Sequence, residues 1–73
     1  MTEGDLVRVT CNVWCYTRSG AIVDKTFNKG AVFRIHTMFT IFGRQAAARL
    51  VSRDGKWIST RSIDANFFTP LSP

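Results

Sequence analysis

Basic side chains are the groups in this sequence best suited to recognising another molecule. Arginine outnumbers lysine, and the planar guanidinium group forms paired hydrogen bonds with phosphates and carboxylates. After Gly30 the chain carries six basic residues against two acidic ones, and we expect their solvent faces to merge into one patch. The predicted partner-binding or nucleic-acid-binding residues are Arg8, Arg34, Arg44, Arg49, Arg53, Lys56 and Arg61, together with Trp14.

Aromatic residues lie between these cations along the chain. Stacking platforms beside basic grooves are how small barrels hold single-stranded nucleic acid. Trp14 shares the alternating positions of Arg8, so we expect its ring to face outward. Most of the others are expected to fill the core: Tyr16, Phe39, Phe42 and Trp57.

Catalytic and metal-binding chemistry is not predicted. His36 is the single histidine and has no carboxylate close to it in sequence. Cys11 and Cys15 lie four positions apart on an expected strand, about 13 Å from each other, whereas a disulfide needs Cα atoms within about 7 Å. Two thiols and one distant imidazole also fall short of a four-ligand zinc site. We expect both cysteines to act as small buried or edge hydrophobes, with no enzyme activity, metal or cofactor.

The size and charge of the chain limit what it does. Its 73 residues predict one domain spanning 1–73, with frayed ends at 1–4 and 71–73. A net charge of +5 and a pI near 10.0 suggest an acidic partner, although ordinary solubilising charge also explains them. The sequence contains no run of about 18 apolar residues, so we expect no membrane span. The acidic start at 1–5 is unlike a secretory signal, so a cytoplasmic location is expected.

The first half of the chain favours extended structure. Residues 6–16 alternate apolar with polar side chains, as a half-buried strand does. Residues 17–20 have turn chemistry, and 21–27 are expected to form an irregular second arm. A strand from Ala31 as far as Phe42 then places Phe33 and Ile35 on one face and Arg34 on the other, before a break at 43–45.

The second half predicts a hairpin and a closing strand. Asp54 and Gly55 suit a type I′ turn, which would join strands at 46–52 and 56–60. A single helical turn is expected near Ser62–Asn66, followed by a short strand at 67–71. Five short strands on this length favour an all-β fold closed into a small barrel, because closure removes exposed edges.

At this point the sequence resembles the SH3-like barrels, a group that includes Tudor-like and KOW-like domains. The run Phe27–Ile35 is similar to the SH3 pattern of a Phe, a polar residue, Lys-Gly-Asp and an alternating strand. Ile63–Phe68 is similar to the SH3 turn Ile-Pro-Ser-Asn-Tyr-Val, and the Asp54–Gly55 hairpin lies where that family has its distal hairpin. The resemblance covers about 21–71 and implies a five-stranded SH3-like barrel.

Departures from this family bear on function. SH3 domains hold polyproline peptides with aromatic residues, but the matching position after the long loop carries Gln45-Ala46-Ala47 rather than a Trp pair. The N-terminal Ala-Leu-Tyr-Asp-Tyr motif is absent. The loop that would meet a ligand's arginine holds only Asp24 as an acid. We therefore expect no binding of proline-rich peptides.

Two functions remain open at this stage. We expect a monomeric, non-enzymatic binding module that docks through a basic face on an acidic surface of a larger machine and regulates it. A nucleoprotein machine such as RNA polymerase is one example of such a partner. The alternative is a small barrel that binds RNA or DNA directly. In size and charge alone, the chain is similar to small phage-encoded regulators of host transcription machinery.

Overall fold

The structure is a computed structural model that describes residues 1–20 and 23–71. Strands dominate it, as expected, and there is one 3-10 turn, η1. The elements are β1 Leu6–Val9, β2 Val13–Thr17, β3 Asp24–Phe27, β4 Val32–Ile41, β5 Arg44–Ser52, β6 Trp57–Ser59, β7 Ile63–Asp64, η1 Ala65–Phe67 and β8 Phe68–Pro70. Within the described residues, none of the helical structure has the length and apolarity that crossing a membrane requires.

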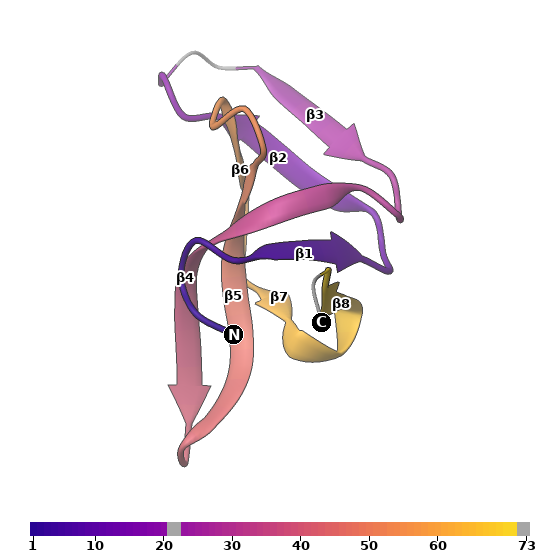
Figure 1. Cartoon of the computed structure of the whole chain (residues 1–73). Helices are drawn as coiled ribbons and strands as arrows, with labels where there is room; N and C mark the ends of the chain where they lie inside the picture. The colour runs from indigo at the N-terminus through magenta and orange to yellow at the C-terminus, as the bar shows by residue number, and fades with distance from the viewer. Residues whose placement is uncertain (21–22, 72–73) are drawn as a thin grey trace.

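All eight strands belong to one curled antiparallel sheet. Its order is β3-β2-β6-β5-β4-β1-β8, and β7 pairs with β5 beside this path. Figure 1 shows the sheet folding round into a half-barrel. The predictions of five strands and of a closed barrel are therefore wrong. Within the described part β3 and β8 form the two ends of the sheet, because each is paired along only one side.

The first predicted strand is divided into β1 and β2, which lie in different parts of the sheet. β1 pairs with β4 and β8, whereas β2 pairs with β3 and β6. The chain changes direction at 10–12, where the Asn12 side chain accepts a hydrogen bond from the Lys29 backbone N–H at 2.8 Å. The side chains of Val9 and Val13 are buried on both sides of this break. The alternation of buried and exposed residues continues through 10–12, so the sequence pattern does not reveal that the chain changes direction there.

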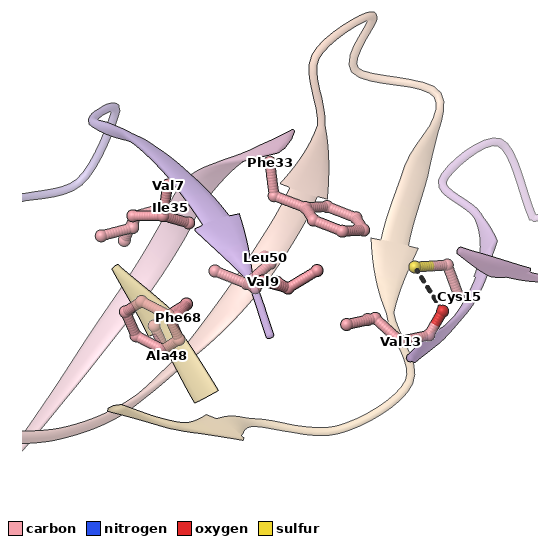
Figure 2. Close-up of a cluster of buried hydrophobic side chains, with 9 residues drawn as sticks. All are labelled: Val7, Val9, Val13, Cys15, Phe33, Ile35, Ala48, Leu50 and Phe68. Atoms are coloured by element: carbon pink, nitrogen blue, oxygen red, sulfur yellow. Dashed lines mark hydrogen bonds between the residues drawn. The ribbon is translucent and has the colours of Figure 1, made fainter. Parts of the chain in front are cut away.

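The core is a compact set of apolar side chains from both parts of the sheet (Figure 2). Phe33 and Leu50 are fully buried, and burying a side chain of that size is worth about 1.5–3 kcal/mol. Ala48 is also fully buried, and Figure 2 shows the ring of Phe68 beside it. The small residue leaves room for the closing strand. The other members of the cluster are Val7, Val9, Val13, Cys15 and Ile35.

Strands β4 and β5 form the longest hairpin of the sheet. They pair from Phe33 opposite Ser52 to Ile41 opposite Arg44, with register shifts between Ile35 and Thr37 and between Phe39 and Thr40. Figure 1 shows the far end of this hairpin extending beyond the other strands. We call residues 37–49 the arm. It accounts for the elongated shape of the molecule, whose extents are 35 × 22 × 18 Å.

The arm ends in a two-residue turn, Phe42–Gly43. Their φ angles are 52° and 76°, as a type I′ turn requires. The predicted break at 43–45 is therefore one residue late at its start, and Arg44 and Gln45 belong to β5. Gly43 adopts a positive φ without strain. A large residue such as Phe42 is rarely found with a positive φ.

The hairpin at Asp54–Gly55 is confirmed, but its turn differs from the prediction. Gly55 has a φ of 79° and donates its N–H to the Ser52 carbonyl at 2.9 Å, while Asp54 has no positive φ. The loop is therefore a four-residue connection around an ordinary β-turn, not type I′. Asp54 Oδ1 accepts the Ser52 hydroxyl at 2.6 Å and the Lys56 N–H at 3.0 Å.

The C-terminal part follows the predicted order with shifted boundaries. The helical turn lies at 65–67 instead of 62–66, because the Asp64 carboxylate accepts the Asn66 N–H at 2.9 Å and caps it. β8 is the expected closing strand and pairs with β1. The irregular extended segment expected at 21–27 contains β3, and its first two residues, Ala21 and Ile22, lie outside the described residues. Ser72 and Pro73 of the expected frayed end lie outside them as well. The domain limits stay predictions.

Candidate binding surface

The face of the sheet that points away from the core carries a continuous row of side chains across six strands. Register alone defines it, because residues that are directly opposite in neighbouring strands point to the same side. The row runs through Asp24, Tyr16, Ile58, Val51, Arg34 and Leu6. We call this side the outer face. It combines an acid at one edge, an apolar centre and a cation.

Three predicted arginines lie on the outer face. Arg8 stands opposite Val32 and Arg34 opposite Leu6, so the two cations are diagonal neighbours on β1 and β4. Both are exposed, and each donates one side-chain hydrogen bond of 2.8 Å to a backbone carbonyl, of Gly30 and Gly4 respectively. Arg49 lies on β5. These hydrogen bonds fix the two exposed guanidinium groups near the sheet without neutralising them.

The other predicted cations lie in loops or at the end of a strand. Arg44 follows the turn of the arm, whereas Arg53 and Lys56 lie in the β5–β6 loop at the opposite end of β5. A nine-residue strand separates these ends by about 30 Å. Arg61 is exposed between β6 and β7. The basic residues thus form separate groups, and Arg44 does not join Arg53 in the single patch that the sequence suggested.

The aromatic residues are more exposed than the sequence suggested. Trp14 is 51% exposed, which confirms that its ring faces outward. Tyr16, Phe39 and Phe42 are exposed as well, contrary to the expectation that they fill the core. Trp57 packs against the core cluster. Trp14 and Tyr16 are successive outward positions of β2, so their Cα atoms are about 7 Å apart.

Several of the side chains described above line a groove on the outer face. Its volume is about 830 Å³. Its wall is formed by β2, the turn after it, β3, β5 and β6. The lining residues are Tyr16, Thr17, Arg18, Gly20, Val23, Asp24, Arg49 and Ile58. We call it the β2–β3 groove. It offers two cations, one carboxylate and apolar surface to whatever enters it.

Arg49 has an unusual environment in this groove. Its side chain is half-buried, and Nη2 donates to the Ser59 carbonyl at 2.6 Å. Its Nε is buried and has no hydrogen-bond partner within the described part of the chain. A buried unpaired donor costs about 1–3 kcal/mol. Because a guanidinium group is a cation, the groove beside it favours an anionic occupant.

Lys25 is held on the opposite side of the sheet, a feature that the sequence gave no reason to expect. Its Nζ lies 4.8 Å from the centre of the Phe27 ring and 5.7 Å from that of Trp57. Phe27 in turn makes edge contacts with Phe33 and Trp57, at 5.2 and 6.2 Å between ring centres. Phe27 and Trp57 pack against the core cluster, and Lys25 remains exposed above them. Segment 24–27 has no apolar alternation that would reveal this arrangement.

The thiols and the histidine differ in how far they are buried. Cys15 is buried, and loss of solvent raises the pKa of its thiol to about 11. Cys11 is half-buried, and both are free cysteines. His36 is exposed, with Nδ1 2.8 Å from the Thr37 hydroxyl. Across residues 1–20 and 23–71, no three His, Cys, Asp or Glu side chains gather as a metal ion would require.

Comparison of the chain with protein-family models, with curated proteins and with solved structures gives no match. The fold on which the groove and the arm rest is a small antiparallel half-barrel made of strands, a shape compatible with small barrel folds. The function must therefore be inferred from the surface of this chain.

Proposed function

We propose that this chain is a non-enzymatic binding module whose outer face docks on an acidic surface of a larger assembly, such as RNA polymerase, and regulates it. The observation that carries the proposal is Arg49, a half-buried cation in the β2–β3 groove with an unpartnered Nε. Because this guanidinium lines the groove, its positive charge would attract a carboxylate that enters there.

The composition of the groove supports an acidic protein segment as its occupant. Val23 and Ile58 offer apolar contact, while Arg18 and Arg49 offer positive charge. Asp24 lies in the same groove and would repel the continuous negative charge of a phosphate backbone. A peptide with one or two carboxylates among apolar side chains fits this combination. Tyrosine and arginine are also enriched among the residues that dominate protein interfaces.

We also propose that the half-barrel is SH3-like. Two features support this: the Asp54–Gly55 hairpin and the turn at 65–67 occur where the resemblance implies them. Size and charge alone support the narrower proposal of a phage-encoded regulator. The Gln45-Ala46-Ala47 segment forms part of β5 and holds no Trp pair, which supports a partner other than a proline-rich peptide.

Affinity capture from lysate, with and without nuclease, tests the docking proposal. The full chain should retain a protein partner after nuclease treatment, and Arg49→Gln should lose at least ten-fold in that partner's recovery. Arg61→Gln is the matched control, because Arg61 is exposed and is not among the groove residues. Loss of all partners on nuclease treatment, or equal recovery by Arg49→Gln and the parent chain, would refute the proposal.

Direct binding of nucleic acid is the second candidate function. The exposed rings of Trp14 and Tyr16 favour it, since they are spaced along one strand as stacking platforms require. Binding to RNA or DNA should then weaken steeply as salt rises. Anisotropy titrations with labelled oligonucleotides measure this, and an absence of binding at low salt excludes it.

A further inference from the structure

The tip of the arm is built against local preference. Phe42 has a φ of 52°, and it is the one residue other than glycine with a positive φ among those described. Type I′ turns strongly favour Asn, Asp or Gly at this position, because a large side chain is strained there. Backbone strain that the fold does not need is a reason to look for a function.

The side chain that causes this strain makes no contribution to packing. Phe42 is 100% exposed, and its ring therefore presents both faces to the solvent. Ile41 and Phe39, next to it on the same hairpin, are 59% and 42% exposed. Three large apolar side chains thus gather at the end of a narrow two-stranded projection. Burial against a partner would remove this apolar surface from water.

Charge along the same hairpin indicates what that partner carries. Residues 32–52 contain three arginines and no aspartate or glutamate. Arg44 directly follows the turn and is exposed. A carboxylate from outside the hairpin lies near its tip: Asp64 of β7 stands opposite Ala47 and lines the same hollow as Phe42 and Arg44. The tip is an apolar wedge on a hairpin whose own charges are all positive, with Arg44 beside the ring and Asp64 of β7 across the hollow. The charge of the hairpin complements an anionic surface that is able to accept a flat ring.

We propose that the arm binds double-stranded DNA, with Phe42 inserted between two base pairs from the minor groove and Arg44 against a neighbouring phosphate. Stacked bases supply the flat apolar slot, and the backbone on either side supplies the negative charge. Apolar side chains that enter a base step unstack it and kink the duplex. The inference rests on the second candidate function and adds the element, the residue and the deformation.

A duplex with 2-aminopurine near its centre and fluorophores at its ends tests the insertion. The full chain should raise the 2-aminopurine fluorescence and bring the ends closer. Phe42→Asn should abolish both signals and weaken binding by about ten-fold, which corresponds to about 1.4 kcal/mol. Asparagine accepts a positive φ, so the arm keeps its turn. Phe67→Asn is the control: this phenylalanine is 48% exposed on η1 and should leave both signals unchanged.

The outcomes separate the wedge from nucleic-acid binding itself. If the chain binds the duplex in a salt-dependent manner but Phe42→Asn behaves like the parent, binding stands and the wedge is refuted. If nothing binds the duplex at low salt, both fall. Vesicles with phosphatidylserine and the polymer poly-glutamate are run alongside. A Phe42-dependent interaction with either one, and none with DNA, would overturn the proposal in favour of a lipid or protein partner.

Discussion

Two hairpin turns of the same sheet, at opposite ends of β5, use their residues in opposite ways. In the β5–β6 loop, Asp54 accepts hydrogen bonds from Ser52 and Lys56, so its side chain stabilises the turn that contains it. In the arm, Phe42 adopts a strained φ and its ring contacts solvent alone. The side chain of the first turn thus stabilises the fold, whereas the ring of the second turn adds nothing to its packing.

The largest expected effect concerns the strands that lead to the arm. Leu50 is fully buried near its base, whereas Ile41 is 59% exposed near its tip. Leu50→Ala should lower the free energy of unfolding by about 2–5 kcal/mol. Ile41→Ala should change it by less than about 0.5 kcal/mol. Urea denaturation measures both, and a large loss for Ile41→Ala would show that the tip is part of the folding unit.

The glycines of the two turns should respond alike. Gly43 and Gly55 have φ angles of 76° and 79°, and an added methyl group would contact nothing at either position. Alanine is therefore penalised only through its backbone, by about 1–2 kcal/mol in each case. Thermal denaturation of Gly43→Ala and Gly55→Ala checks this. Markedly unequal costs would mean that the two turns differ in more than their side chains.

Replacing Phe42 should make the protein more stable. Phe42→Asn keeps the positive φ at lower cost, and we expect the free energy of unfolding to rise by about 1 kcal/mol. For a domain of this size that raises Tm by about 4–8 °C. Phe39→Asn, in the adjoining strand, should bring no such gain. A fall in the Tm of Phe42→Asn would show that the ring contributes to the stability of the fold.

The smallest effect is expected at Asp54, and it depends on pH. The Ser52 hydroxyl and the Lys56 N–H lower the pKa of its carboxyl group. The unfolded chain then binds the proton more readily, so the stabilisation is present above the ordinary pKa of 3.8 and is lost as pH falls through the folded value. Asp54→Asn should have a shallower acid denaturation curve. An unchanged curve would show that these hydrogen bonds do not favour the ionised form.

Local chemistry explains which parts of the fold were predictable from the sequence. Alternation correctly placed Phe33 and Ile35 inside and Arg34 outside, and Asp54–Gly55 correctly marked a hairpin. The type I′ turn was assigned to that hairpin and occurs instead at Phe42–Gly43, because glycine preference identifies only one of its two central residues. The preference at the other position is overridden in this chain.

The binding surface was predictable residue by residue but not as an arrangement. Composition identified Arg49, yet its groove depends on the pairing of β2 with β3 and β6, which brings Tyr16 between Asp24 and Ile58. Contacts between residues so distant in sequence leave no periodic signal. The contact of Lys25 with the Trp57 ring likewise depends on the pairing of β2 with both β3 and β6.

The open sheet leaves two terminal strands, and each carries a feature that discourages self-association. Unpaired backbone groups along an edge invite other strands to add to them, the first step towards fibrils. Pro70 in β8 lacks an N–H to offer, and β3 is short and begins with the charged pair Asp24-Lys25. A half-barrel with such guarded margins should remain dispersed at concentrations where an unprotected ribbon would polymerise.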